Sequence, residues 1–188
     1  GYSVGGAGNI SLVLPDGTIL ATPTNSCLGR LDPEQLSVAD MDGTHLHGSA
    51  PTKELSLHLA VYRARPSCKA VVHLHSTYVT ALSCQEDVNT EDALRPFTPY
   101  YVMKVGRLPV APYYKPGSPK LGEAAAAIVR DNPVFLLANH GSVVCGKSLA
   151  DAVNNAEELE ETAKLHFLLQ ASGRPASYLT EREITELY

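Results

Sequence analysis

The spacing of apolar and polar residues changes along the chain. Stretches in which apolar and polar residues alternate, and stretches of unbroken apolar residues, predict strands. Residues 10–14 and 18–21 flank the turn signal Pro15-Asp16-Gly17, which predicts a hairpin. Later runs rich in β-branched and apolar residues predict buried strands. These strands are expected at residues 70–75, 100–110, 134–138 and 142–145.

Other stretches repeat every three to four residues, which predicts amphipathic helices. The chain has such a pattern after Glu54, in the alanine-rich residues 121–131, and in a long segment from Ser148 to about residue 171. Asp32-Pro33 predicts the start of a short helix, and Thr180 with Glu183 predicts a capping box for the last one.

Strands and helices alternate without an internal repeat or a linker. Residues 1–188 are therefore expected to form one α/β domain, with a central, largely antiparallel (mixed) sheet flanked by helices. Because the chain begins with a glycine in a loop-like stretch, we expect natural sequence upstream of it to be missing.

Composition narrows the class of partner. Of 188 residues 44% are hydrophobic and 19% charged, and the net charge of −5 comes with scattered rather than clustered basic residues. Nucleic acids and anionic membranes need a basic face, so neither is expected as a partner. A small phosphorylated molecule needs only a local nest of donors. Neither a signal peptide nor an apolar run of the roughly 20 residues that span a bilayer is visible.

The four cysteines (Cys27, Cys68, Cys84 and Cys145) are widely spaced and form no CxxC pair. They are expected to be reduced thiols, mostly buried, in a cytoplasmic protein, with a two-disulfide framework as the alternative.

The sharpest chemical pattern is His73-Leu74-His75 within an apolar strand. Side chains alternate along a strand, so the two imidazoles lie on the same face, about 7 Å apart along the backbone. Such a pair can converge on one metal ion, and the apolar neighbours would shield it. The alternative is an amphipathic strand that happens to carry two histidines.

A third histidine, His140, ends the apolar strand predicted at residues 134–138, where an unpaired buried imidazole would be costly. If the two strands are neighbours, His140 joins His73 and His75 as a third ligand. Three histidines with an open fourth position are typical of a catalytic zinc site. The pair His45 and His47 has the same spacing, but its polar surroundings indicate an exposed edge. The two remaining histidines, His58 and His166, are expected to be packing or surface residues.

Glu54 is the candidate general acid/base, since it precedes the first long helix and adjoins an apolar site. The competing interpretation is a glutamate favoured by the helix dipole. Gly8-Asn9, Thr24-Asn25 and Thr52-Lys53 offer donors in loops or at a helix start, as an anion site requires, although each alone is also an ordinary turn or cap.

Taken in order, these motifs resemble the class II aldolase/adducin family along nearly the whole chain. The matching segments are Gly-Asn-Ile-Ser at 8–11, Thr-Pro-Thr at 22–24, Pro-Thr-Lys-Glu at 51–54, His-Leu-His-Ser at 73–76 and Asn-His-Gly at 139–141.

The resemblance implies that Glu54 is the catalytic acid/base and that one Zn²⁺ is held by His73, His75 and His140. It also implies a phosphate pocket, formed by Asn9, Thr24, Asn25, Thr52 and Lys53. Two of these positions depart from the sugar-phosphate aldolases, which often have glycine in place of Asn25 and have serine in place of Lys53.

Within the family the chain is most similar to the decarboxylases of 3-oxo-tetronate 4-phosphates, notably at residues 51–58, 112–117 and 157–163. That similarity implies loss of CO2 through a metal-stabilised enediolate to give dihydroxyacetone phosphate. Family members are typically tetramers in which a tyrosine from a neighbouring subunit assists. Tyr101 is the candidate here, followed by Tyr100.

Three alternatives remain open at this point: an aldolase acting on a ketose 1-phosphate, a non-catalytic adducin-like interaction module, and a structural zinc protein. An acid preserved beside three ligands argues against the interaction module, and the lack of a fourth nearby cysteine or histidine argues against the structural zinc protein.

Overall fold

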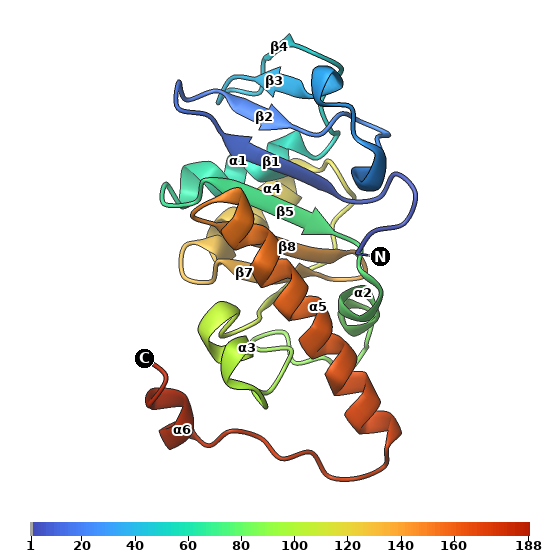
Figure 1. The fold of residues 1–188 in the computed structure, drawn as a ribbon, viewed down its shortest axis with the longest axis vertical. Coiled ribbons are helices and arrows are strands. Elements are labelled where there is room, and N and C mark those ends of the chain that lie inside the picture. The colour runs from blue at the N-terminus through green and yellow to red at the C-terminus, as the bar shows by residue number, and fades with distance from the viewer. Residues whose placement is uncertain (1) are drawn as a thin grey trace.

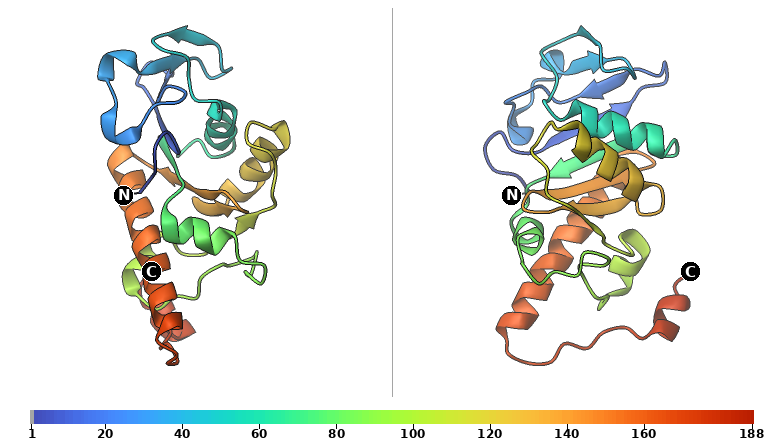
Figure 2. Two further views of the ribbon diagram at one scale, coloured as in Figure 1. Left: turned by 90° about the vertical axis from the view of Figure 1, so that its right-hand side faces the viewer. Right: turned by 180° about the vertical axis from the view of Figure 1, so that it is seen from behind.

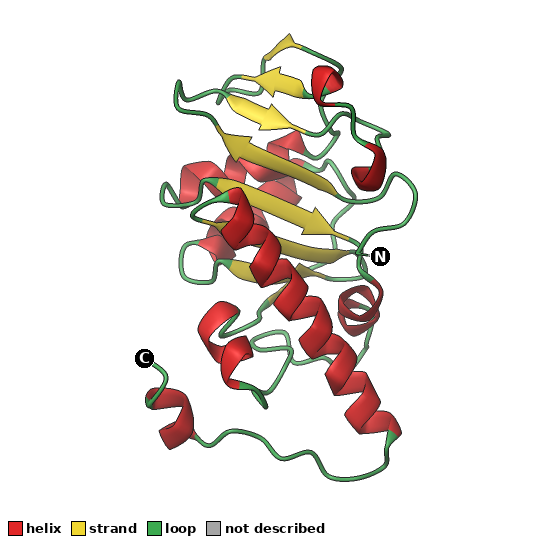
Figure 3. Ribbon diagram, in the orientation of Figure 1, coloured by secondary structure: helices red, strands yellow, loops and turns green. Residues whose placement is uncertain are grey.

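The computed structural model describes residues 2–188, which form one central sheet with helices on both faces (Figures 1 and 3). In this described part of the chain the sheet has eight strands, in the order β4-β3-β2-β1-β5-β8-β7-β6. Their bounds are β1 Asn9–Val13, β2 Ile19–Ala21, β3 Ser37–Ala39, β4 His45–His47, β5 Ala70–Leu74, β6 Val110–Ala111, β7 Val134–Leu137 and β8 Gly141–Gly146.

Neighbouring strands in the described sheet run antiparallel, apart from the parallel pair β6 and β7. The expected largely antiparallel, mixed sheet is therefore confirmed. Strand β5 lies at its centre, between β1 and β8, and its residues Ala70–Leu74 are all buried. Because the strand is buried on both faces, its sequence is a nearly continuous apolar run rather than an alternation of apolar and polar residues.

The helices divide between the two faces. Helices α1 (Leu55–Ala64) and α4 (Pro119–Val129) cover one face, and α2 (Thr77–Ser83), α3 (Pro99–Lys104) and the long α5 (Leu149–Ala171) cover the other. Figure 1 looks onto α5, and the rear view in Figure 2 shows α1 and α4. Val71 packs in the core beneath α1 and α4, whereas Val72 packs beneath α5. Since side chains alternate, His73 shares the face of Val71.

The short elements also follow local signals. The 3₁₀ turn Pro33–Gln35 begins where Asp32 accepts a hydrogen bond from the backbone of Glu34, and a second such turn spans Leu28–Arg30. The last helix, α6 (Glu181–Thr185), has the expected capping box between Thr180 and Glu183. None of the helices in the described chain is long and apolar enough to cross a membrane.

One strand prediction was wrong. Residues 100–110 carry helix α3 and only the two-residue strand β6. Thr98 caps the helix by accepting from the backbone N–H of Tyr101, and Pro99 occupies its first turn. This cap and proline favour a helix more strongly than the β-prone residues that follow favour a strand.

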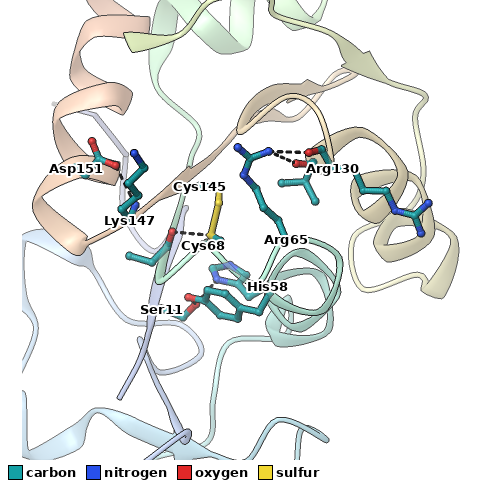
Figure 4. Close-up of a disulfide and its surroundings, with 11 residues drawn as sticks. Ser11, His58, Arg65, Cys68, Arg130, Cys145, Lys147 and Asp151 are labelled. Carbon is teal, nitrogen blue, oxygen red and sulfur yellow. Dashed lines mark hydrogen bonds between the residues drawn. A yellow bond between two sulfur atoms is a disulfide. The ribbon is translucent and has the colours of Figure 1, made fainter. Parts of the chain in front are cut away.

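The cysteines also differ from expectation. Cys68 and Cys145 form a disulfide that joins the segment before β5 to the end of β8 (Figure 4), while Cys27 and Cys84 are free. The pairing arises because Cys145 lies opposite Val71 in the sheet, and Cys68 precedes Val71 by only three residues. A separation of 77 residues in sequence hides this proximity.

Candidate active site

The centre of the sheet brings three imidazoles together. His73 lies on β5 and is fully buried, and His75 follows directly after that strand. His140 comes from the tight turn between β7 and β8. The ring centroids are 4.7–4.9 Å apart in all three pairs, and the rings are steeply inclined to one another. The rings therefore converge edge-on, as ligands of a common ion would.

The glycines beside these histidines are required by the close packing of the strands. Gly141 has a φ of 157°, and a Cβ added there would lie 2.2 Å from the carbonyl oxygen of Leu74. Gly8 has a φ of 77°, and a Cβ there would lie 2.9 Å from the carbonyl oxygen of His73. Only glycine lets the His140 turn and the start of β1 approach the end of β5 so closely.

The tautomer of His73 is fixed by its backbone partner. Its Nδ1 lies 2.7 Å from the carbonyl oxygen of Ser142, which can only accept, so Nδ1 carries the proton. In the neutral ring Nε2 then presents a lone pair. This atom lies 3.0 Å from Nε2 of His75 and 3.3 Å from Oε2 of Glu54. Lone pairs that face one another at such distances repel each other, and a cation bound between them would remove that repulsion.

A divalent metal ion fits this group. One ligand atom from each of Glu54, His73, His75 and His140 lies within 4.8 Å of all the others. Nitrogens bound tetrahedrally to Zn²⁺ at 2.0–2.1 Å are about 3.3 Å apart, close to the His73–His75 separation. In addition, the buried Oε1 of Glu54 has no hydrogen-bond partner and lies 3.6 Å from Nε2 of His140. An orphaned anionic oxygen beside three imidazole lone pairs points to a bound cation.

Glu54 is held at the N-terminal end of α1 and is only 8% exposed. Its backbone N–H donates to Oγ1 of Thr52, and its Oε2 accepts from Nδ2 of Asn9 at 2.9 Å. Burial by itself would raise the pKa of this carboxyl. The neighbouring His73 and the Asn9 amide outweigh burial and hold the pKa of this carboxyl well below its usual range. Glu54 is thus a carboxylate in the free site.

The imidazoles of the site are suited to bind metal at neutral pH. Burial, and then the neighbouring His73 and His140, lower the pKa of His75 to about 4. Burial and His73 also lower the pKa of His140. Both rings are therefore neutral at pH 7 and have lone pairs to offer, as metal ligands must.

The other histidines lie outside this group. His45 and His47 are exposed on the edge strand β4, as predicted, and three strands separate β4 from β5. His58, expected to be a packing or surface residue, lies fully buried on α1. Its Nε2 contacts Oδ1 of Asn9 at 2.5 Å, so it adjoins the site through Asn9. The helical spacing of Glu54 and His58 was visible in the sequence, but the contact with β1 was not.

Four of the five residues predicted to bind phosphate fall into two adjacent loops, and the fifth, Asn9, begins β1. The backbone N–H of Thr24 donates to Ala50, that of Thr52 donates to Thr22, and Pro23 and Pro51 form a β-bridge. The loops that carry Thr24, Asn25, Thr52 and Lys53 therefore lie side by side next to Glu54. Asn25 adopts a left-handed φ of 59°, a conformation that glycine and asparagine adopt more readily than other residues.

The Asn9 side chain contacts Glu54 through one hydrogen of its amide nitrogen and His58 through its amide oxygen. Its role in phosphate binding stays a prediction. One predicted role does not fit the structure. Tyr101 is 1% exposed, and its hydroxyl faces the carbonyl oxygen of Leu94, so it cannot reach the site of a neighbouring subunit. Its position on the inner face of α3 could not be inferred from a segment predicted to be a strand. Tyr100, on the same helix, is 63% exposed.

Comparison with known proteins agrees with this arrangement. Residues 1–167 match the model of the family described as Class II Aldolase and Adducin N-terminal domain. The chain belongs to this family. The match includes every residue of the Glu54, His73, His75 and His140 group.

Several relatives of this class II aldolase domain carry a functional name. The chain is 58% identical over 187 residues to the 3-oxo-tetronate 4-phosphate decarboxylase of Escherichia coli O6:H1, covering 100% of this chain and 87% of that protein. It is 42% identical over 168 residues to the L-fuculose phosphate aldolase of Methanocaldococcus jannaschii, covering 89% of this chain and 87% of that protein. The structure of YgbL from Escherichia coli superposes with a TM-score of 0.96 at 57% identity, covering 100% of this chain and 89% of that one.

These relatives include carboxy-lyases and aldehyde-lyases on the same class II aldolase fold. Both reactions break a carbon–carbon bond next to a carbonyl group, so a single metal and acid/base centre can serve either. Groups around the centre must then decide which bond breaks.

Proposed function

We propose that this chain is a zinc-dependent carboxy-lyase that converts a 3-oxo-tetronate 4-phosphate to dihydroxyacetone phosphate and CO2. The single observation that carries the proposal is the convergence of three imidazole nitrogens on Glu54, whose free Oε1 faces the same point. The 58% identity to a protein named 3-oxo-tetronate 4-phosphate decarboxylase supports the choice of substrate.

His73, His75 and His140 would hold one Zn²⁺ per chain, since three nitrogen donors with a further open position suit this ion. When bound, the zinc supplies Lewis-acid stabilisation of the negative charge that loss of CO2 leaves on the substrate. Ser142 contributes indirectly, because its carbonyl oxygen fixes the His73 tautomer that directs Nε2 to the ion.

Glu54 acts as the general acid/base that transfers the proton. Because it is a carboxylate in the free site, it must first accept a proton, from the substrate's C2 hydroxyl or from water. It then delivers that proton to C2 after the carboxylate has left as CO2. The reaction consumes one solvent proton overall and places one solvent-derived hydrogen at C2. Oε1 is the atom positioned for this transfer, because Oε2 is held by Asn9.

The phosphate of the substrate would bind in the paired loops that carry Thr24, Asn25, Thr52 and Lys53. Thr52 accepts from the backbone of Glu54, so its hydroxyl proton is free to donate. Lys53 is exposed and adds a positive charge beside the acid/base. Binding the phosphate here would place the far end of a four-carbon substrate near the three histidines.

We expect Lys53→Ala to raise KM for the phosphorylated substrate while kcat changes little. Loss of one charged hydrogen bond costs about 1.5–3 kcal/mol, which corresponds to roughly a 10- to 150-fold weaker apparent affinity. Steady-state kinetics would measure this change. Lys69, an exposed lysine at the opposite end of β5, provides the matched control as Lys69→Ala. An unchanged KM in Lys53→Ala would move the phosphate elsewhere.

An aldolase acting on a ketose 1-phosphate is the second candidate, favoured by the 42% identity to a protein named L-fuculose phosphate aldolase. One experiment separates the two reactions. Purified zinc-loaded enzyme is given a 3-oxo-tetronate 4-phosphate and, in parallel, L-fuculose 1-phosphate, while CO2, dihydroxyacetone phosphate and aldehyde are followed. We expect kcat/KM to favour the decarboxylation by about a hundredfold or more. Aldehyde release at the higher efficiency would assign the chain to the aldolases.

We further propose that the enzyme works in the cytoplasm as a homo-oligomer, most simply a tetramer, in keeping with its family. Tyr100 takes the place of Tyr101 as the tyrosine that α3 could present to a neighbouring subunit, because it is the exposed member of the pair.

A further inference from the structure

A chain of buried polar residues runs from Glu54 into the core beneath α1. Its five members come from β1 and from the start and one face of α1, and each is at most 8% exposed: Asn9, Ser11, Glu54, His58 and Tyr62. Consecutive members are 2.5–2.9 Å apart. Figure 4 shows the Ser11 and His58 part of this chain, close to the disulfide. Nothing in the mechanism proposed above uses residues beyond Asn9.

Its hydrogen bonds have one consistent direction. The Glu54 carboxylate can only accept, so the Asn9 amide donates through Nδ2 and turns Oδ1 toward His58. Nε2 of His58 must then carry the ring proton and donate to that oxygen. Nδ1, without a proton in the neutral ring, accepts from the hydroxyl of Ser11 at 2.7 Å. Ser11 in turn accepts from the hydroxyl of Tyr62 at 2.7 Å.

The ring of His58 is neutral, as this direction requires. The residue is fully buried, and burial lowers its pKa to about 3. The groups that face it are Asn9 and Ser11 from β1, and Glu54 from its own helix through Asn9. From β5, the nearest titratable group is His73.

The direction of the chain decides which way the Asn9 amide points. With His58 donating, Oδ1 is held and Nδ2 must face Oε2 of Glu54. If the amide turned over, two acceptor oxygens would meet between buried side chains, which is strongly unfavourable. Oε2 is thereby anchored, and Oε1 remains the one carboxylate oxygen without a partner.

We propose that His58 is a positioning residue for catalysis: by fixing the Asn9 amide, it aims Oε1 of Glu54 at the reacting carbon. This inference rests on the proposed function, since it assigns to Glu54 the proton transfer described above. His58 touches neither metal ligand nor substrate and acts through Asn9. Its effect should fall on kcat, because a misaimed carboxylate slows proton transfer without weakening the phosphate contacts.

The test compares two substitutions at this position. In His58→Leu the donor to Asn9 is lost, and we expect kcat to fall by about 10- to 100-fold while KM and zinc content change less than about threefold. Glutamine can replace the ring in both contacts, because its amide nitrogen donates to Asn9 and its amide oxygen accepts from Ser11. His58→Gln is therefore expected to recover most of the lost kcat. A residue needed only for packing would not discriminate between the two in this way.

Two controls separate positioning from general destabilisation. Ser37→Ala removes a buried hydrogen bond of β3, from Ser37 to the carbonyl oxygen of Ser49, and should leave kcat unchanged. In an Asn9→Ala background, His58→Leu should add little to the loss, because its effect passes through Asn9. The proposal would be overturned if His58→Leu lowered kcat by the same factor in the wild-type and in the Asn9→Ala background. It would also be overturned if His58→Leu left kcat unchanged.

If His58→Leu does not fold, Ser11→Ala takes its place. It removes the hydrogen bond that Nδ1 accepts and that holds the ring in place against Asn9, so kcat should fall by about three- to tenfold at unchanged KM. A normal kcat in that variant would equally overturn the proposal. Failure of the proposed function has a different signature, because the wild-type enzyme itself would then not release CO2 from the substrate.

Discussion

His73→Ala and His75→Ala are each expected to lose the bound metal and, with it, essentially all activity. Each change removes one of three nitrogen ligands, and two imidazoles with a carboxylate cannot hold the ion as firmly. Metal analysis of the purified protein should show about one zinc per chain in the wild type and less than about a tenth of that in either variant. Activity should fall by a factor of about a thousand or more.

The chain contains a matched control for this change. His47→Ala removes a histidine of the same spacing pattern from the exposed strand β4, and it should leave both zinc content and activity intact. Full metal occupancy after both His73 and His75 have been changed would contradict the assignment of the ligands.

Glu54→Gln is expected to keep its zinc and to bind substrate while kcat falls by about 10²–10⁴-fold. The amide preserves the shape of the side chain but cannot carry the proton to C2. Zinc content and substrate affinity must be measured on the same preparation, because a carboxylate beside three histidines could instead be a fourth ligand. Loss of zinc together with activity would favour that second role.

Glu160→Gln serves as the control for Glu54. Glu160 is also a buried carboxylate, and it accepts from the backbone of Tyr78 and Val79 at the start of α2. The same isosteric change there costs stability but leaves the proton transfer untouched. Its kcat should therefore remain near that of the wild type.

The ligand geometry could be predicted because it depends mainly on local periodicity. Alternation along β5 places His73 and His75 on one face, and a histidine at the end of a buried strand needs a partner. These two rules bring three histidines to one point once β5 and β8 are neighbours. The family resemblance supplied the role of Glu54, which the sequence pattern alone left undecided.

What could not be predicted depends on contacts between distant segments. The engagement of Asn9 requires the register of β1 on β5 together with the position of α1 above both strands. The burial of His58 follows from the same packing. The Cys68–Cys145 pairing likewise results from the alignment of β5 with β8. Helix α3 was missed because β-prone residues follow its cap.

The position of the tyrosines shows how one such error propagates. Residues 100–110 were expected to form a strand, so adjacent tyrosines would have pointed to opposite faces. In the helix, Tyr101 packs into the core and Tyr100 faces outward. The helix that begins at the Thr98 cap therefore decides which of the two tyrosines is exposed.

The central claim, that Glu54 protonates C2 after CO2 has left, is tested most directly by running the reaction in heavy water. The product dihydroxyacetone phosphate is analysed by NMR for deuterium at the carbon derived from C2. Wild-type enzyme should introduce one deuteron with a single stereochemistry, because Oε1 approaches from one face. Glu54→Gln should release CO2 slowly and give product without that stereochemical preference. Stereospecific labelling at near-normal turnover in Glu54→Gln would contradict the account and assign the proton to another residue.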